Sequence, residues 1–350
     1  MCSFNTRVKY GKTDKEELMQ QISHLKYISF SSSGSHGFLF EGIIQAMEDN
    51  MPDFDSWLRS LKGVSGTSGG ALMALIIALS IERQQRSKIL TCLSDLTNVI
   101  RCPNISLMLN NFGIEDGASF RRIIQDILNL GGLSENSTMN DLHRLLRIDV
   151  AFVAHNLLDG KTVNLTVETV PELLVCDAVF ASCCIPLVFA PVKFKEYVLC
   201  DGAISSYTPQ VFPIDLTFHV IIPPWYYCKN IDTWMNFLRS FLVTCLVHQR
   251  PVIDSILASQ NCINAYHPFM DKIGSLEKRM NQKMSDTIVH CGYIAGVLFI
   301  YDNLAALLFT LVRKHIDYTL LFHELIARSQ ANGAPEALDD ENDSEDDQYN

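Results

Sequence analysis

One pentapeptide constrains the fold of this chain more than any other stretch: Gly66-Thr67-Ser68-Gly69-Gly70, which fits the pattern G-x-S-x-G. It follows a short apolar run and opens an apolar, helix-like stretch over residues 71–79. A serine on so tight a turn needs small neighbours, and Gly66 and Gly70 provide the room. Gly69 and Gly70 also leave backbone N–H groups free at the helix start. The pattern predicts a nucleophilic Ser68; a Gly/Ser-rich turn between two buried elements is the alternative interpretation.

A second unit of the same kind precedes the first. Residues 26–30 are typical of a strand, 31–37 form a loop of small residues, and 38–47 are helix-like. Two such units in succession predict an α/β fold with a mostly parallel sheet and helices on its faces. Loops that follow parallel strands meet at the carboxyl edge of the sheet, so the 31–37 loop is expected beside Ser68. An ordinary connection between strand and helix would look similar.

Composition limits the class of protein. The chain has 350 residues, of which 48% are hydrophobic, enough for one large domain or a domain with an appended piece. Its net charge is -11, but residues 331–350 hold eight acidic side chains and no Lys or Arg, so the rest is nearly neutral. The chain contains no basic tract, and we therefore expect no nucleic-acid partner.

The cysteines and the N-terminus indicate a compartment. Eleven scattered cysteines without a C-x-x-C motif argue against a zinc site or a disulfide framework. Residues 1–26 are polar and lack the apolar core of a signal peptide. We expect an intracellular, cytoplasmic protein with peripheral membrane association.

Other elements are predicted by periodicity and by breakers. Helices are expected over residues 13–24, 86–100, 118–129, 139–146 and 173–184, strands over 148–154, 161–167, 189–192, 197–200 and 216–222, and a turn over 112–117. Asp201-Gly202-Ala203 follows the strand at 197–200. An acid at that strand end can place its carboxylate in a site, although a D-G turn is the commoner use of the dipeptide.

Beyond residue 224 the chain is mainly helical and apolar. A long helix is expected over 231–248, and residues 287–312 include only three strongly polar side chains, His290, Asp302 and Asn303. A mid-span acid is costly in lipid, so this segment is interpreted first as a buried core helix. An interfacial or membrane-anchoring segment is the alternative. Residues 336–350 are predicted to be a disordered acidic tail.

Four motifs together resemble the patatin-like phospholipase family. They are the loop from Phe30 to Gly37 with Gly42, the pentapeptide around Ser68, the stretch Ala178-Val179-Phe180-Ala181-Ser182-Cys183-Cys184-Ile185-Pro186-Leu187-Val188-Phe189-Ala190-Pro191, and Asp201-Gly202-Ala203. The resemblance implies a three-layer α/β/α fold. It covers about residues 26–223, which we expect to form the catalytic domain. Periodicity and composition divide the rest into an N-terminal helix (1–25), a helical C-terminal region (224–335) and the tail (336–350).

The resemblance also implies an activity: a phospholipase A that cleaves acyl esters of membrane glycerophospholipids, with no metal or cofactor. Ser68 is the nucleophile and Asp201 the proton acceptor. Gly34, Ser35, Gly37 and Gly69 would form the oxyanion hole, supported by Gly66, Gly70, Gly202 and Ala203. A neutral-lipid lipase and a weakly active or inactive lipid- or protein-binding module are the alternatives. No particular protein partner is predicted.

One motif departs from the family. The oxyanion-loop motif of the family is G-G-G-x-[KR]-G, whereas this chain has Ser32-Ser33-Gly34-Ser35-His36-Gly37 at these positions. Serine adopts a positive φ only at a cost, so the oxyanion loop is expected to be distorted if position 32 or 33 requires one. His36 would contact a phosphate or only solvate the loop. A Ser–His–Asp arrangement with His155 or His219 as the base is a further alternative.

Overall fold

The computed structural model describes residues 15–96, 105–224, 234–259, 261–265 and 282–300. The strands are β1 (Tyr27–Phe30), β2 (Gly63–Thr67), β3 (Gly113–Glu115), β4 (Asp149–Asn156), β5 (Lys161–Leu165), β6 (Leu187–Phe189), β7 (Val192–Phe194), β8 (Tyr197–Asp201), β9 (Thr217–Ile221) and β10 (Cys262–Asn264). The α-helices are α1 (Lys15–Ser23), α2 (Phe38–Asn50), α3 (Phe54–Ser60), α4 (Gly69–Ala78), α5 (Arg83–Leu96), α6 (Ile105–Asn111), α7 (Ala118–Leu130), α8 (Met139–Leu146), α9 (Val175–Cys183), α10 (Trp234–Leu246), α11 (Arg250–Leu257) and α13 (Gln282–Ile300). Short 3₁₀ turns are η1 (Gly34–Gly37), η2 (Gly202–Ile204), η3 (Ile214–Leu216) and η4 (Val247–Gln249).

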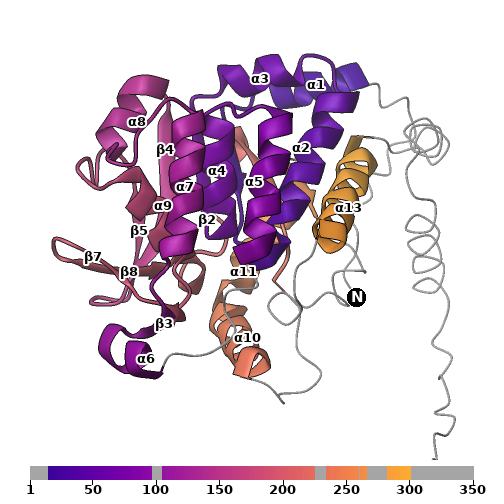
Figure 1. Cartoon of the computed structure of the whole chain (residues 1–350). Helices are drawn as coiled ribbons and strands as arrows, with labels where there is room; N and C mark the ends of the chain where they lie inside the picture. The colour runs from indigo at the N-terminus through magenta and orange to yellow at the C-terminus, as the bar shows by residue number, and fades with distance from the viewer. Residues whose placement is uncertain (1–14, 97–104, 225–233, 260, 266–281, 301–350) are drawn as a thin grey trace, which may run out of the picture.

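A mixed, mostly parallel sheet forms the centre of the molecule. Its strand order is β10-β9-β1-β2-β4-β8-β7, and β5 pairs with β4. The first five of these strands run parallel, whereas β5, β7 and β8 are antiparallel to their neighbours. Helices α1 and α3 lie at the end where the parallel strands begin, and α6, β3 and α10 lie at the opposite end (Figure 1). That opposite end carries the loops after β1 and β2.

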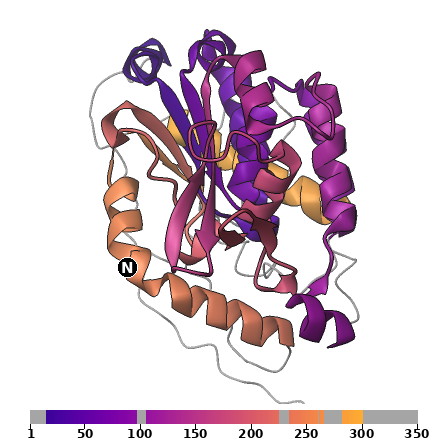
Figure 2. The ribbon, with the colours of Figure 1, turned by 90° about the vertical axis from the view of Figure 1, so that its left-hand side faces the viewer.

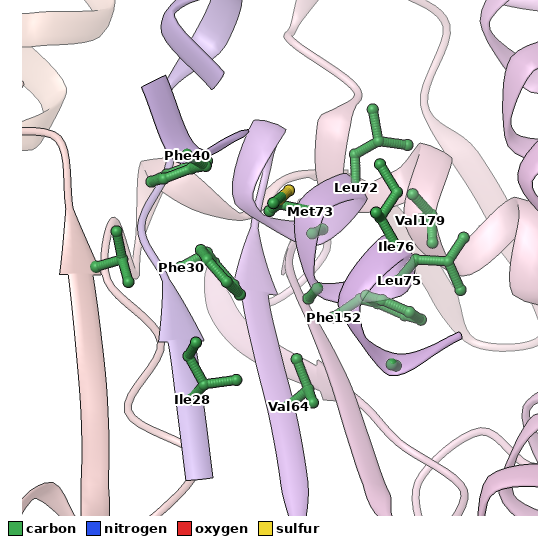
Figure 3. Packing of buried hydrophobic residues seen from close by; sticks show 14 of the residues in the cluster. Ile28, Phe30, Phe40, Val64, Leu72, Met73, Leu75, Ile76, Phe152 and Val179 are labelled. Atoms are coloured by element: carbon green, nitrogen blue, oxygen red, sulfur yellow. The ribbon is translucent and has the colours of Figure 1, made fainter. Parts of the chain in front are cut away.

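Helices cover both faces of the sheet, as the α/β/α prediction requires. The main core joins β1, β2 and β4 to helices α2, α4 and α9, with Phe30, Phe40, Met73 and Phe152 at its centre (Figure 3). Side chains alternate between the faces of β9: Phe218 and Val220 belong to this core, whereas Ile221 packs against α10 and α11 in a second cluster. Figure 2 shows the sheet between α11 on one side and α4 on the other.

Most predicted helices and strands are confirmed within one to four residues at the ends that the structure describes; residues 97–100 and 231–233 of two predicted helices lie outside the described residues. The strand predicted over 189–192 is wrong: Phe189 ends β6, Val192 begins β7, and Ala190 and Pro191 lie between them. Two short strands were missed. Residues 112–117, predicted as a turn, contain β3, which pairs with β6 as a parallel two-stranded sheet. The region after residue 224 contains β10, which extends the central sheet beside β9. Three-residue strands carry too little periodicity to be recognised from sequence.

The long apolar segment predicted over 287–312 is in part a buried helix. Its described part belongs to α13, which packs against α2, while residues 301–312 and the tail at 336–350 lie outside the described residues. Glycines bring the two backbones together: a β-carbon on Gly42 would lie 1.8 Å from the Val289 carbonyl oxygen, and one on Gly292 would lie 2.1 Å from the Leu39 carbonyl oxygen. Within the described ranges no helix has the length and apolar character needed to cross a membrane.

The contact between α2 and α13 gives a first prediction. In an ordinary helix interior, glycine to alanine stabilises by about 1 kcal/mol. Gly42→Ala is expected to do the opposite, lowering the free energy of unfolding by about 1–3 kcal/mol, because its methyl group meets the α13 backbone. Urea unfolding measures the change, with Asn129→Ala on the exposed side of α7 as the control. A more stable Gly42→Ala protein would contradict the packing.

Candidate active site

Ser68 lies on a strained turn between β2 and α4. Its φ of 56° and ψ of -127° are sparsely populated for a residue with a β-carbon and cost on the order of 1–3 kcal/mol. Glycines make the turn possible. A β-carbon on Gly66 would lie 2.1 Å from the Gly70 carbonyl oxygen, and one on Gly70 would lie 2.3 Å from the Ser31 carbonyl oxygen. The two motif glycines, predicted as spacers, thus lie where the turn touches itself and the neighbouring loop.

Two side chains of α9 hold this turn from below. The Ser68 N–H donates to Ser182 Oγ over 3.0 Å, and the Ser182 hydroxyl donates to the Val153 carbonyl over 2.5 Å. The Cys183 thiol donates to the Ser68 carbonyl over 3.0 Å, and burial raises its pKa well above the ordinary value, so it stays protonated as a donor. Sequence reasoning quoted both residues as motif members but assigned them no role. Their place just before Pro186, at the end of a small-residue helix, was the available signal.

Asp201 meets Ser68 directly. The Ser68 hydroxyl donates to Asp201 Oδ2 over 2.7 Å, and Asp201 Oδ1 accepts the Ala203 N–H over 2.9 Å. Both side chains are buried, with 4% and 5% of their residue surfaces exposed. Burial raises the pKa of Asp201 to about 6, although the hydrogen bonds from Ser68 and Ala203 oppose the shift. The result is a carboxylate with increased basicity in contact with a hydroxyl.

Strand register brings these two residues together. Thr67, the residue before Ser68, pairs with Val153 of β4, and Asp201 pairs with Ala154, the next residue of β4. A β-carbon on Gly202 would lie 2.1 Å from the Val153 carbonyl oxygen, so only glycine fits the turn that follows Asp201. The motif glycine Gly202 therefore allows β8 to end beside Val153 and Ala154 of β4.

The loop after β1 lies against the start of α4. A β-carbon on Gly69 would lie 2.3 Å from Ser33 Oγ and 3.0 Å from the Gly34 carbonyl oxygen. Gly34, Gly37 and Gly69 line a cleft beside Ser68, and Ser35 lies within η1 between the first two. Gly69, as the first residue of a helix, has no intrahelical acceptor for its N–H. The four residues predicted for the oxyanion hole are thus brought to one place.

The expected distortion of this loop is not found. Ser33 has a φ of -150°, and Ser32 is not among the residues with positive φ; the left-handed position is Gly34, with a φ of 54°. The Ser32 N–H donates to the Tyr207 carbonyl over 2.8 Å, and Ser31 Oγ accepts the Ile222 N–H over 2.9 Å. The Ser32 N–H and the Ser31 hydroxyl therefore connect the loop to its neighbours, and Gly34, the loop position with a positive φ, is a glycine.

The two alternative histidine bases lie elsewhere. His219 Nδ1 shares a 2.7 Å hydrogen bond with Ser29 Oγ, and burial lowers its pKa to about 4. His155 lies on β4, where it pairs with Thr162 of β5 and Cys200 of β8, and burial lowers its pKa as well. Neither lines a cleft at Ser68, whereas His36 does. A Ser–His–Asp triad built on either residue is not supported by this geometry.

Two clefts open from Ser68. The Asp201 cleft, about 120 Å³, is lined by Asp201, His36 and Tyr207 and by apolar side chains of α10. The Phe120 cleft, about 190 Å³, is lined by Phe120 and by apolar side chains of α4 and α5. Both include Gly34, Ser68 and Ile185. Among the described residues, no three His, Cys, Asp or Glu side chains cluster as metal ligands.

Comparison with known proteins identifies a family. A family model described as "Patatin-like phospholipase" matches residues 28–212, more than half of the chain. Among solved structures, VipD from Legionella pneumophila aligns with a TM-score of 0.47 and 15% identity, over 79% of this chain and 67% of VipD. The type III effector ExoU aligns with a TM-score of 0.43 and 14% identity, over 88% of this chain and 63% of ExoU. The chain thus spans about two-thirds of the length of these neighbours. A search of curated proteins found no sequence match.

The raised pKa of Asp201 predicts a pH-dependent stability. Between 3.8, its ordinary pKa, and about 6, the folded protein holds a proton that the unfolded chain releases, so wild-type stability falls as pH rises through this range. Asp201→Asn does not titrate, and its amide can donate to Ser68 while its carbonyl accepts from Ala203. From pH 4 to pH 7 the variant should gain up to about 3 kcal/mol relative to wild type, at about 1.4 kcal/mol per pKa unit.

Urea unfolding at both pH values measures this gain. Asn129→Ala, on the exposed side of α7, is the control, because neither side chain titrates and its effect should be the same at both pH values. An Asp201→Asn difference that is the same at pH 4 and pH 7 would mean that the carboxyl group is not destabilised by burial.

Proposed function

Because the chain belongs to the patatin-like phospholipase family, we propose that it is a serine acyl hydrolase acting through Ser68 and Asp201. The observation that carries this proposal is the 2.7 Å hydrogen bond from the Ser68 hydroxyl to Asp201 Oδ2, on a strained turn at the meeting point of two clefts. A nucleophile held in contact with its base is what acyl transfer requires.

The reaction follows from these contacts. As Ser68 Oγ attacks the ester carbonyl carbon, Asp201 accepts the hydroxyl proton and the carbonyl oxygen becomes an oxyanion. The ester C–O bond then breaks, and Asp201 returns the proton to the departing alcohol oxygen. Water repeats the cycle on the acyl-enzyme: Asp201 takes a proton from water, and Ser68 Oγ leaves with it. Only ionised Asp201 can start the cycle, so its raised pKa sets the lower pH limit.

The oxyanion would be held by backbone N–H groups. The Ser68 N–H is already used by Ser182, so the donor on the nucleophile side is the Gly69 N–H. Gly34 and Ser35 lie opposite and would supply the others. Each such donor is worth about 100- to 1,000-fold in rate. Neither Ser32 nor Ser33 has a positive φ, which supports turnover over the inactive-module alternative.

Phospholipid is the substrate class that the family suggests, and neutral acylglycerol is the second candidate. One observation favours the second. His36 is the sole basic side chain among the described residues that line the Asp201 cleft, and the described part of the Phe120 cleft has none. Lys and Arg are the usual partners of a phosphate. A neutral alcohol portion would need no such partner.

The first test is release of fatty acid from phosphatidylcholine–phosphatidylglycerol vesicles and from triacylglycerol emulsion, both with EDTA. Wild type should release fatty acid from at least one. Ser68→Ala and Asp201→Asn should each lose at least about 1,000-fold in kcat/KM, because the two groups act as a unit. Ser255→Ala and Asp254→Asn, at two exposed positions of α11, are the matched controls. Activity that survives in Ser68→Ala would disprove the mechanism.

We also propose that the protein binds lipid surfaces peripherally, with its clefts facing the lipid. Leu109 and Phe112, three residues apart at α6, are 74% and 61% exposed; Phe237 and Phe241, four apart on α10, are 45% and 52% exposed. Both views show α6 and α10 at the end of the molecule where β1 and β2 finish (Figures 1 and 2). We call these four side chains the apolar rim. Exposed apolar patches of this kind mark interaction sites.

The rim predicts vesicle binding independent of turnover. In a Ser68→Ala background, Leu109→Ser with Phe112→Ser, or Phe237→Ser with Phe241→Ser, should weaken binding to phosphatidylcholine vesicles at least about tenfold, since each large apolar side chain contributes about 1.5–3 kcal/mol when fully buried. Vesicle flotation measures the binding. Leu130→Ser with Leu145→Ser, exposed on α7 and α8 at the far end, is the control. Equal loss in the control and rim variants would assign the effect to general hydrophobicity.

A further inference from the structure

The two clefts that meet at Ser68 differ in which reacting groups they contain. Asp201 lines the Asp201 cleft and is absent from the lining of the Phe120 cleft. Gly69 and Cys183 show the reverse distribution. The base therefore faces one cleft, and Gly69, the expected oxyanion donor next to the nucleophile, faces the other, while Gly34 lines both.

The direction of proton transfer distinguishes the two sides of an ester. In the proposed cycle the proton that Asp201 takes from Ser68 goes to the alcohol oxygen as the C–O bond breaks. That oxygen must therefore lie within hydrogen-bond reach of Asp201 when it departs. The acyl chain, attached to the other side of the carbonyl carbon, points away from Asp201.

From this geometry we infer that the Phe120 cleft holds the acyl chain and the Asp201 cleft holds the alcohol portion of the substrate. The inference rests on the proposed acyl hydrolase activity. It gives each cleft a substrate part: a hydrocarbon chain between α4, α5 and Phe120, and a glycerol-type alcohol between the loop after β1 and α10.

The chemistry of the walls agrees independently of the proton path. Leu72, Met73 and Ile76 on α4 line the Phe120 cleft together with Phe120 and Phe189, and its two acidic residues are the neighbours Glu115 and Asp116. The Asp201 cleft presents polar groups of Ser32, Ser33, His36 and Tyr207. Hydrocarbon chains favour apolar walls, whereas hydroxyl and ester groups of an alcohol portion need hydrogen-bond partners.

The position of a residue along α4 indicates how deep in the acyl cleft its side chain lies. Ser68 is the residue just before the first turn of α4, and Ile76 is eight residues further on, about 12 Å along the axis at 1.5 Å per residue. A larger side chain at 76 should block long acyl chains and leave short ones unaffected. Leu242 of α10 is the matched position in the other cleft, where a larger side chain should obstruct bulky alcohols.

The test compares two ester series in wild type, Ile76→Trp and Leu242→Trp. One series varies the acyl chain of p-nitrophenyl esters from four to sixteen carbons; the other varies the alcohol of butyrate esters. Ile76→Trp should lower the long-to-short acyl ratio of kcat/KM at least tenfold and leave the alcohol ratio within twofold. Leu242→Trp should do the reverse. The opposite pattern would overturn the assignment. Leu90→Trp, at a half-buried position on α5, replaces Ile76→Trp if that protein does not fold.

A second measurement does not depend on turnover. An alkyl fluorophosphonate with a diazirine at the end of its chain bonds to the Ser68 oxygen and expels fluoride, so the chain occupies the acyl cleft. After irradiation, mass spectrometry should find cross-links to residues 72–76 of α4. Cross-links to α10 would overturn the inference. Absence of both ester cleavage and labelling at Ser68 would instead reject the proposed function.

Discussion

The left-handed backbone of Ser68 is the constraint on which the rest of the site depends. Its φ of 56° is unfavourable for serine, and the surrounding structure must supply the energy that holds it there. Gly66 and Gly70 allow the turn to close on itself, while Ser182 and Cys183 bind its N–H and C=O from α9. These contacts direct the side chain into the clefts and use the Ser68 amide, which leaves the Gly69 N–H as the donor that we propose for an oxyanion.

Burial of Asp201 links stability to chemistry. An ionised carboxylate in this position is destabilising, which is why its pKa lies near 6 rather than 3.8. The same desolvation makes the carboxylate a stronger base for the Ser68 hydroxyl. Among the residues that the structure describes, two hydrogen bonds, from Ser68 and Ala203, compensate the charge. A third donor would stabilise the protein and weaken the base, so the sparse hydrogen bonding of Asp201 fits a catalytic role better than a structural one.

Sequence reasoning recovered what local chemistry encodes. Ser68 lies on a glycine-rich turn after a strand, and Asp201 lies at a strand end before a glycine. Because β8 runs antiparallel to β4, the rule for parallel strands does not bring these two ends together, but their contact could be predicted from the resemblance to the family. The supports from Ser182 and Cys183 could not, because nothing local shows that α9 passes beneath the turn. The loop distortion was expected only if position 32 or 33 required a positive φ, and the sequence could not show whether either does, because three glycines in a family motif do not reveal which one has a positive φ. Here it is Gly34. The α13 helix was recognised as apolar, but its glycine contact with α2 depends on tertiary packing.

The register of β4 connects the two catalytic candidates more firmly than their sequence separation suggests. β2 approaches β4 in parallel and β8 approaches it antiparallel, yet Thr67 and Asp201 pair with the consecutive residues Val153 and Ala154. A slip of one residue in β8 would turn the Asp201 side chain to the opposite face of the sheet. The close fit of Gly202 against the Val153 carbonyl opposes such a slip, and Ser182 bonds to that same carbonyl while holding Ser68. The Val153 peptide unit of β4 thus contacts the residues that position both the base and the nucleophile, so the geometry of the pair depends on strand pairing in the sheet as well as on the turn that carries Ser68.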